Sequence, residues 1–297
     1  MRSFNFIPYL LLLFPFSHCS KPADDIKNDS GNYIKSTIQY NKAVSITPNL
    51  VSLNVYRFEQ TTVLKPVIIW VHGGGWRIGD KTNSLSNKLA LFNSLNYIFV
   101  SVNYRLSPVT NSTDPNRIKF PVHNNDVADA VKWVINSIAA YGGNKNKIVL
   151  LGHSAGAHLV SLTGTSQQFL PARSIPLNML KGIASIDTEG YDVPSQNTEE
   201  IYQNAFGNNY NEQVKASPIY NISSSISYPR FFVAKRGSAN RIALSDNFIL
   251  KLRTAGVPVT EVNGSIYDHE GINDAIGNTN DTVITPALKQ FLSLCFQ

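Results

Sequence analysis

The stretch NKIVLLGHSAGAHLVSL (residues 146–162) joins an apolar run, a turn of small residues and a helical pattern. The run KIVLLG (147–152) has the length and continuous apolarity of a strand buried on both faces, as in a parallel sheet. The segment AGAHLVSLTG (155–164) continues as a helix, so Ser154 lies on the tight turn between them. A serine at the apex of a strand–turn–helix with the pattern G-x-S-x-G predicts an exposed nucleophile.

Similar apolar runs recur along the chain and alternate with helical patterns such as 126–143 and 243–256. This alternation predicts one doubly wound α/β domain over residues 46–297, with a mostly parallel sheet and helices on both faces. The segment VSLNVYRF (51–58) alternates apolar and polar residues instead, which predicts an antiparallel edge strand with one solvent-exposed face. The other predicted strands are 66–72, 97–103, 181–187, 230–235 and 257–263.

The N-terminal residues differ in composition from the rest of the chain. Residues 1–19 carry one basic residue and then a run rich in Leu, Ile and Phe, which predicts a signal peptide. The sequence around Cys19 resembles the lipobox of bacterial lipoproteins, and a lipid anchor at Cys19 is expected from it. The protein would then be secreted or exported, and periplasmic or anchored to the outer membrane if it is a bacterial lipoprotein. Residues 20–45 are polar without a sustained period, which predicts a tether.

Composition excludes several classes of protein. The net charge is +6, but the Lys and Arg residues are scattered, so a nucleic-acid partner is not expected. The spacing of the two Cys and six His residues matches no metal site, and no cofactor is expected. The oligomeric state cannot be read from these features.

A second glycine-rich turn, WVHGGGWRIGDK (70–81), follows the first predicted buried strand. Three consecutive glycines leave backbone N–H groups free to approach a ligand closely. Such donors can stabilise the oxyanion that forms during acyl transfer. The glycine turn therefore supports the chemistry that the Ser154 turn predicts.

Five segments carry a specific resemblance and occur in order: VHGGGW (71–76), VNYRLSP (102–108), FPVHNNDVADAVKWV (120–134), YGGNKNKIVLLGHSAGAHL (141–159) and DHEGINDAIG (268–277). Together they resemble the carboxylesterases of the hormone-sensitive-lipase and kynurenine-formamidase branch of the α/β-hydrolases, most of all the bacterial acetyl-xylan and feruloyl esterase type. The resemblance implies the α/β-hydrolase fold. It also implies an oxyanion hole formed by the N–H groups of Gly73, Gly74 and Ala155, with His72 bracing the glycine turn and with Tyr104 and Arg105 supporting structure.

The general base is expected to be a histidine after the last strand, and His269 has both this chain order and a loop position. The acid is harder to assign. In most of the family it follows the next-to-last strand, where this chain reads KRGSANR and places Asn240. Some lipases of this fold take the acid from the end of the strand after the serine, where this chain has Asp187. Asp187 is slightly favoured over Asn240, while Asp192 and Asp246 are less suitable neighbours.

These residues predict a serine esterase that acts on short acyl or aryl carboxylic esters through an acyl-enzyme. The insert at 188–228 is polar, so a large apolar lid is not expected. Its substrate would be a small molecule or a polysaccharide bearing acetyl or feruloyl esters, as the resemblance implies. Two alternatives stay open: an amidase of the arylformamidase type, and a non-catalytic carbohydrate-binding relative that has lost its acid.

Overall fold

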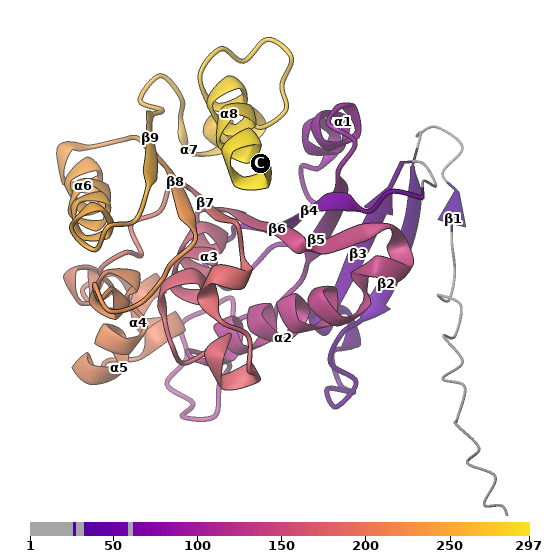
Figure 1. Ribbon diagram of the computed structural model, residues 1–297. Coiled ribbons are helices and arrows are strands. Elements are labelled where there is room, and N and C mark those ends of the chain that lie inside the picture. The colour runs from indigo at the N-terminus through magenta and orange to yellow at the C-terminus, as the bar shows by residue number, and fades with distance from the viewer. Residues whose placement is uncertain (1–25, 28–32, 59–61) are drawn as a thin grey trace, which may run out of the picture.

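The computed structural model describes residues 26–27, 33–58 and 62–297. Within these ranges, nine strands form one sheet (Figure 1). The strands on one side of β5 pair antiparallel and those on the other side pair parallel. In spatial order they are β1 (Ile26–Lys27), β2 (Ile34–Gln39), β3 (Ser52–Arg57), β5 (Ile98–Val102), β4 (Lys65–Val71), β6 (Gly143–His153), β7 (Gly182–Ile186), β8 (Arg230–Lys235) and β9 (Val259–Asn263).

Helices cover both faces of this sheet (Figure 1). Side chains alternate between the faces along each strand, so Val67, Ile69 and Val71 of β4 join one core while Ile68 and Trp70 join the other. The first core includes α2 (Val122–Ser137), α3 (Ala155–Thr165) and α6 (Ala239–Thr254), and the second includes α1 (Ser86–Ser94), α7 (His269–Asp274) and α8 (Ile284–Phe296). Two shorter helices, α4 (Glu200–Phe206) and α5 (Tyr210–Lys215), lie in the insert after β7. The double burial explains why the central strands β4, β5, β6, β7 and β8 read as continuous apolar runs, whereas the edge strand β9 has one buried residue among its five.

The prediction of an edge strand at 51–58 is wrong in one respect. The strand β3 is antiparallel as expected, but all six of its residues are buried. Its outer neighbour is β2, which pairs with β3 from Ile34↔Arg57 to Gln39↔Ser52. Residues 34–39 therefore form a strand where a tether was predicted. Four of its six side chains are polar, which hides this strand in the sequence, although Ile38 packs against the core and the backbone ladder to β3 runs its whole length.

The predicted signal peptide and Cys19 lie outside the described residues. Cys295 lies in α8 and is a buried free thiol whose pKa is raised by burial to about 12. Among the described residues, no helix has both the length and the apolarity needed to cross a bilayer.

Candidate active site

Three parallel strand ends place the principal polar side chains at one edge of the sheet. Ser154 follows β6, and its backbone N–H donates to the carbonyl oxygen of Ile186 at 2.9 Å. Asp187 follows β7, and its N–H donates to the carbonyl oxygen of Ala234 in β8 at 2.9 Å. The sheet ladder thus continues one residue beyond the strands and holds Ser154 and Asp187 as neighbours.

The turn at Ser154 has the strained backbone that its small neighbours suggest. Ser154 has φ 56° and ψ −121°, an unusual conformation for a residue with a side chain. A Cβ at Gly152 would lie 2.4 Å from the carbonyl oxygen of Gly156, and one at Gly156 would lie 2.1 Å from that of Val71. Both glycines are therefore required by close backbone packing, which lifts Ser154 above the sheet at the start of α3.

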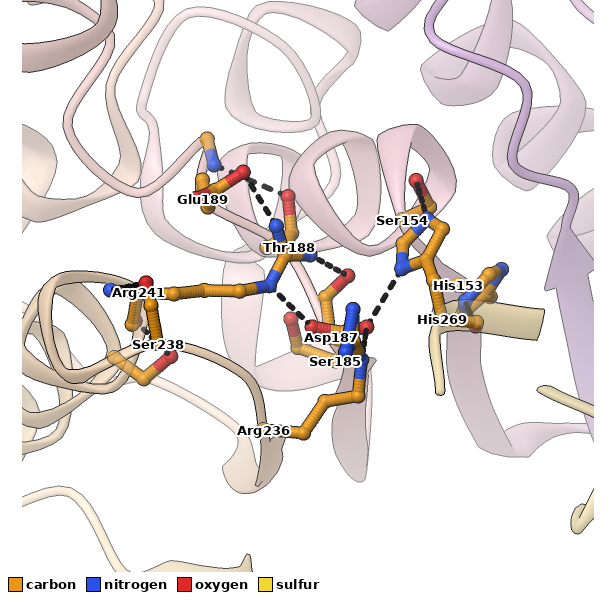
Figure 2. Close-up of polar contacts among 12 residues, drawn as sticks. His153, Ser154, Ser185, Asp187, Thr188, Glu189, Arg236, Ser238, Arg241 and His269 are labelled. Carbon is orange, nitrogen blue, oxygen red and sulfur yellow. Dashed lines mark hydrogen bonds and ion pairs between the residues drawn. The ribbon is translucent and has the colours of Figure 1, made fainter. Parts of the chain in front are cut away.

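His269 connects the serine to the acid (Figure 2). Its Nε2 lies 2.9 Å from Ser154 Oγ, and its Nδ1 lies 2.6 Å from Asp187 Oδ2. Because an ionised carboxylate can only accept, Nδ1 donates to Asp187 and Nε2 is left to accept the serine proton. Asp268 holds the histidine in place by capping α7, since its carboxylate accepts from the N–H of Gly271 at 2.6 Å.

The structure places Asp187, and not Asn240, beside the histidine. Asn240 is exposed in the first turn of α6, while Asp246 forms an ion pair with Lys235. Asp192 accepts a hydrogen bond from the Tyr220 hydroxyl at 3.3 Å. The alternative of Asn240 as the triad's third member is thus not supported by the geometry.

The loop that replaces the expected acid instead brings two arginines to Asp187. Arg236 Nε donates to Asp187 Oδ2 at 2.5 Å, and Arg241 Nε donates to Oδ1 at 2.7 Å (Figure 2). The side chain of Asp187 is only 1% exposed. Burial raises the pKa of this carboxyl, but the hydrogen bonds from His269 and Arg241 and that from Arg236 outweigh burial and hold its pKa below the ordinary value. Asp187 is therefore ionised at neutral pH.

The predicted oxyanion donors lie beside the serine. A Cβ at Gly73 would lie 3.1 Å from Ser154 Cβ, so the glycine turn runs directly against Ser154. Gly74 has φ +112°, and a Cβ there would lie 2.1 Å from the carbonyl oxygen of Ile78. Ala155 is the first residue of α3. Outside helices and strand ladders of the described chain, neither Gly73 nor Gly74 donates a backbone hydrogen bond. These N–H groups are consequently available to an oxyanion.

The supporting residues also lie where the resemblance implied. The Nδ1 atom of His72 contacts the carbonyl oxygen of Gly73 at 2.7 Å, and its ring stacks on Tyr104 with a centroid separation of 4.6 Å. Burial lowers the pKa of His72, so a neutral ring donates from Nδ1 to the glycine turn. Arg105 forms a bidentate ion pair with the buried Asp126. These contacts brace the glycine turn and the loop after β5.

His153 is a neighbour of the triad that the sequence reasoning did not single out. Its ring lies 4.6 Å from that of His269, and its Nε2 lies 2.8 Å from the carbonyl oxygen of His269. Burial and the adjacent His269 lower the pKa of His153 to about 3, so it is neutral and donates this hydrogen bond. Together with Asp187 the two histidines could offer metal ligands. Two guanidinium groups already neutralise the carboxylate, which makes this an unfavourable cation site.

A pocket of about 170 Å³ opens onto Ser154 and His269. Ile201 and Tyr202 of α4 form its wall, so the insert contributes to the site although its sequence is mostly polar. Trp76 anchors α4 through edge-to-face contacts with Tyr202 at 5.0 Å and Phe206 at 4.9 Å. No local pattern marks these residues, because their position depends on how the insert folds back. Trp76 itself lines the pocket, and the remaining lining residues are Gly75, Ala155, Thr188, Glu189 and Arg241.

Comparison with known sequences gives partial matches. Residues 53–175, which are less than half of the chain, match the family model BD-FAE. Esterase LipQ of Mycobacterium tuberculosis is 40% identical over 101 residues, which are 34% of this chain and 22% of that protein. The inactive carboxylesterase-like protein VdtD of Byssochlamys spectabilis is 27% identical over 161 residues, which are 51% of this chain and 28% of that protein. The chain spans about a quarter of the length of these curated relatives.

Similar solved structures cover nearly the whole chain. Esterase B from Lactobacillus rhamnosis superposes with a TM-score of 0.71 at 18% identity, covering 92% of this chain and 90% of that one. An esterase from the archaeon Pyrobaculum calidifontis superposes with a TM-score of 0.66 at 21% identity, covering 83% and 82%. The chain has the α/β-hydrolase fold, which confirms the predicted fold class.

The lowered pKa of Asp187 predicts a pH-dependent contribution to stability. Its ionisation stabilises the folded protein above the ordinary pKa of 3.8, and this contribution is lost as the pH falls through the lowered folded value. Asp187→Asn should therefore unfold at lower urea concentration than wild type at neutral pH, and the difference in unfolding free energy should shrink as the pH falls below the ordinary pKa of 3.8. Urea titrations from neutral pH to below this value measure it. A difference that stays constant would contradict the assignment.

Proposed function

We propose that this protein is a serine esterase that hydrolyses short acyl or aryl carboxylic esters. The observation that carries the proposal is the continuous hydrogen-bonded chain from Ser154 Oγ through both ring nitrogens of His269 to Asp187. This arrangement, with free N–H donors beside the serine, is the one that acyl transfer requires. The similarity of the chain to several esterases supports the same activity.

The reaction would proceed in two halves. His269 Nε2 accepts the proton of Ser154 as Oγ attacks the ester carbonyl, and the N–H groups of Gly73, Gly74 and Ala155 stabilise the oxyanion. The tetrahedral intermediate collapses by breaking the bond to the leaving alkoxide, which takes the proton from His269. Water then attacks the acyl-enzyme, with His269 as general base, and releases the acid and free Ser154.

The small pocket favours short acyl groups. Ile201 and Tyr202 line it, and a volume of about 170 Å³ suits an acetyl group better than a feruloyl group. Among the proposed polysaccharide substrates, acetyl esters are therefore favoured over feruloyl esters. An arylformamidase would use the same residues, so formamide substrates belong in the assay. The non-catalytic carbohydrate-binding alternative was suggested by the absence of an acid at Asn240. Because Asp187 contacts His269, that reason no longer supports it.

Hydrolysis of 4-nitrophenyl acetate by the protein lacking residues 1–19 tests the proposal. Ser154→Ala should abolish turnover, because it removes the nucleophile. Asp187→Asn should lower kcat by about 10⁴-fold, because the imidazolium loses its carboxylate partner. Asn240→Ala is the matched control and should leave kcat/KM unchanged, since this side chain is exposed and does not line the pocket.

Two results would contradict this assignment. If wild type hydrolyses acetyl, feruloyl and formamide substrates no faster than Ser154→Ala, the protein is not an esterase and the binding role is favoured. A large loss of kcat/KM in Asn240→Ala with little change in Asp187→Asn would show that Asn240, and not Asp187, is the partner of His269.

The pocket wall predicts the chain-length preference. A Cβ built on Gly75 would lie 2.3 Å from Ile201 Cδ1, so the Ile201 side chain packs closely over Gly75 in the wall of the pocket. Ile201→Ala should raise kcat/KM for butyrate relative to acetate esters by about tenfold, because it frees space for additional methylenes. Ile219→Ala, in the same insert but outside the pocket, is the control. An unchanged ratio in Ile201→Ala would show that the acyl group binds elsewhere.

We propose in addition that residues 1–18 direct export and that Cys19 receives a lipid. The support is the apolar run and the lipobox-like sequence around Cys19. In a bacterial host, Cys19→Ser should move the protein from the membrane to the soluble fraction. The control Cys295→Ser should stay with the membrane, because this thiol is buried in α8. Identical fractionation of Cys19→Ser and wild type would refute the anchor.

A further inference from the structure

Asp187 has more cationic partners than the proposed reaction needs. A triad requires only that the carboxylate accept from His269, yet Arg236 and Arg241 donate to its two oxygens. Arg241 also donates through Nη2 to the carbonyl oxygen of Asp187 at 3.3 Å and forms an ion pair with Glu189 (Figure 2). Both guanidinium groups are largely buried, with side chains 16% and 15% exposed. Their charges therefore act on the site with little screening by solvent.

The charges of this cluster cancel. Two guanidinium groups stand against the carboxylates of Asp187 and Glu189, so these four side chains together carry no net charge. A lone buried aspartate would instead attract a proton to the ring of His269. The other ionisable groups that face this cluster are the neutral His153, Tyr191 and Tyr202. The carboxylates of Asp268 and Glu270 flank His269 in sequence, and Lys88 of α1 acts on the neighbouring His153.

We propose that Arg236 and Arg241 are positioning residues that orient Asp187 and, by balancing its charge, set the pH below which activity is lost. This inference rests on the proposed esterase function. Orientation follows from the geometry, because two guanidinium groups fix both carboxylate oxygens and leave Oδ2 facing Nδ1. Charge balance follows from their burial. The consequence is an acidic limb of the pH–activity profile that lies lower than Asp187 alone would set.

The pH dependence of kcat/KM for 4-nitrophenyl acetate tests this inference. Arg236→Gln removes one positive charge beside Asp187 without altering the pocket, because Arg236 does not line it. Its acidic limb should move to higher pH by about one unit, since the remaining negative charge favours the protonated ring. Arg241→Gln should shift the limb in the same direction and also change KM, because Arg241 lines the pocket. It is the second variant if Arg236→Gln does not fold.

Matched variants separate charge from structure. Arg236→Lys keeps the charge but loses the planar guanidinium, so its limb should stay within a few tenths of a unit of wild type while kcat falls. Arg253→Gln removes the same kind of charge from α6 at a site that pairs with Glu261, and its profile should match wild type. Thermal unfolding of each variant verifies that it is folded.

The inference is overturned if Arg236→Gln and Arg241→Gln fold and lose activity equally at every pH, with the acidic limb unmoved. The same holds if Arg236→Lys shifts the limb as far as Arg236→Gln does. Failure of the esterase function is a separate result, since wild type would then not differ from Ser154→Ala at any pH.

Discussion

The parallel ladder that joins β6, β7 and β8 is the constraint on which the site depends. Each strand ends one position before a polar or charged residue, and backbone hydrogen bonds from Ser154 to β7 and from Asp187 to β8 extend the pairing into the loops. Parallel strands end at the same edge, so Ser154 and Asp187 become neighbours although 32 residues of sequence separate the ends of their strands. The histidine needs only to reach this edge from α7, whose first residue it is.

Local signals explain what could be predicted from the sequence. Apolar runs give the buried strands because both faces of the sheet are covered, and the serine turn is marked by glycines that no side chain could replace. The choice between Asp187 and Asn240 was not local. It depends on which strand ends are adjacent and on the direction of the first turn of α6, and the spacing of residues in the sequence predicts neither.

The missed features share a non-local origin. Strand β2 is mostly polar in sequence and pairs with β3 along its whole length. Ile201 and Tyr202 reach the pocket because aromatic contacts to Trp76 fold the insert back onto the sheet. The segment KRGSANR suggested only a missing acid, whereas it brings two cations to an acid on the neighbouring loop. Its meaning depends on Asp187, which lies about 50 residues earlier.

Arg241 belongs to two sets of contacts at once, the support of Asp187 and the wall of the pocket. This shared membership restricts how the protein can diversify. A substitution at 241 that suited a new substrate would also disturb the acid, so selection for altered specificity faces a trade-off at this position. Position 201 touches the pocket without touching the triad, and changes there carry no such penalty. Substrate range in related chains should therefore vary first in the insert, while the arginines stay fixed.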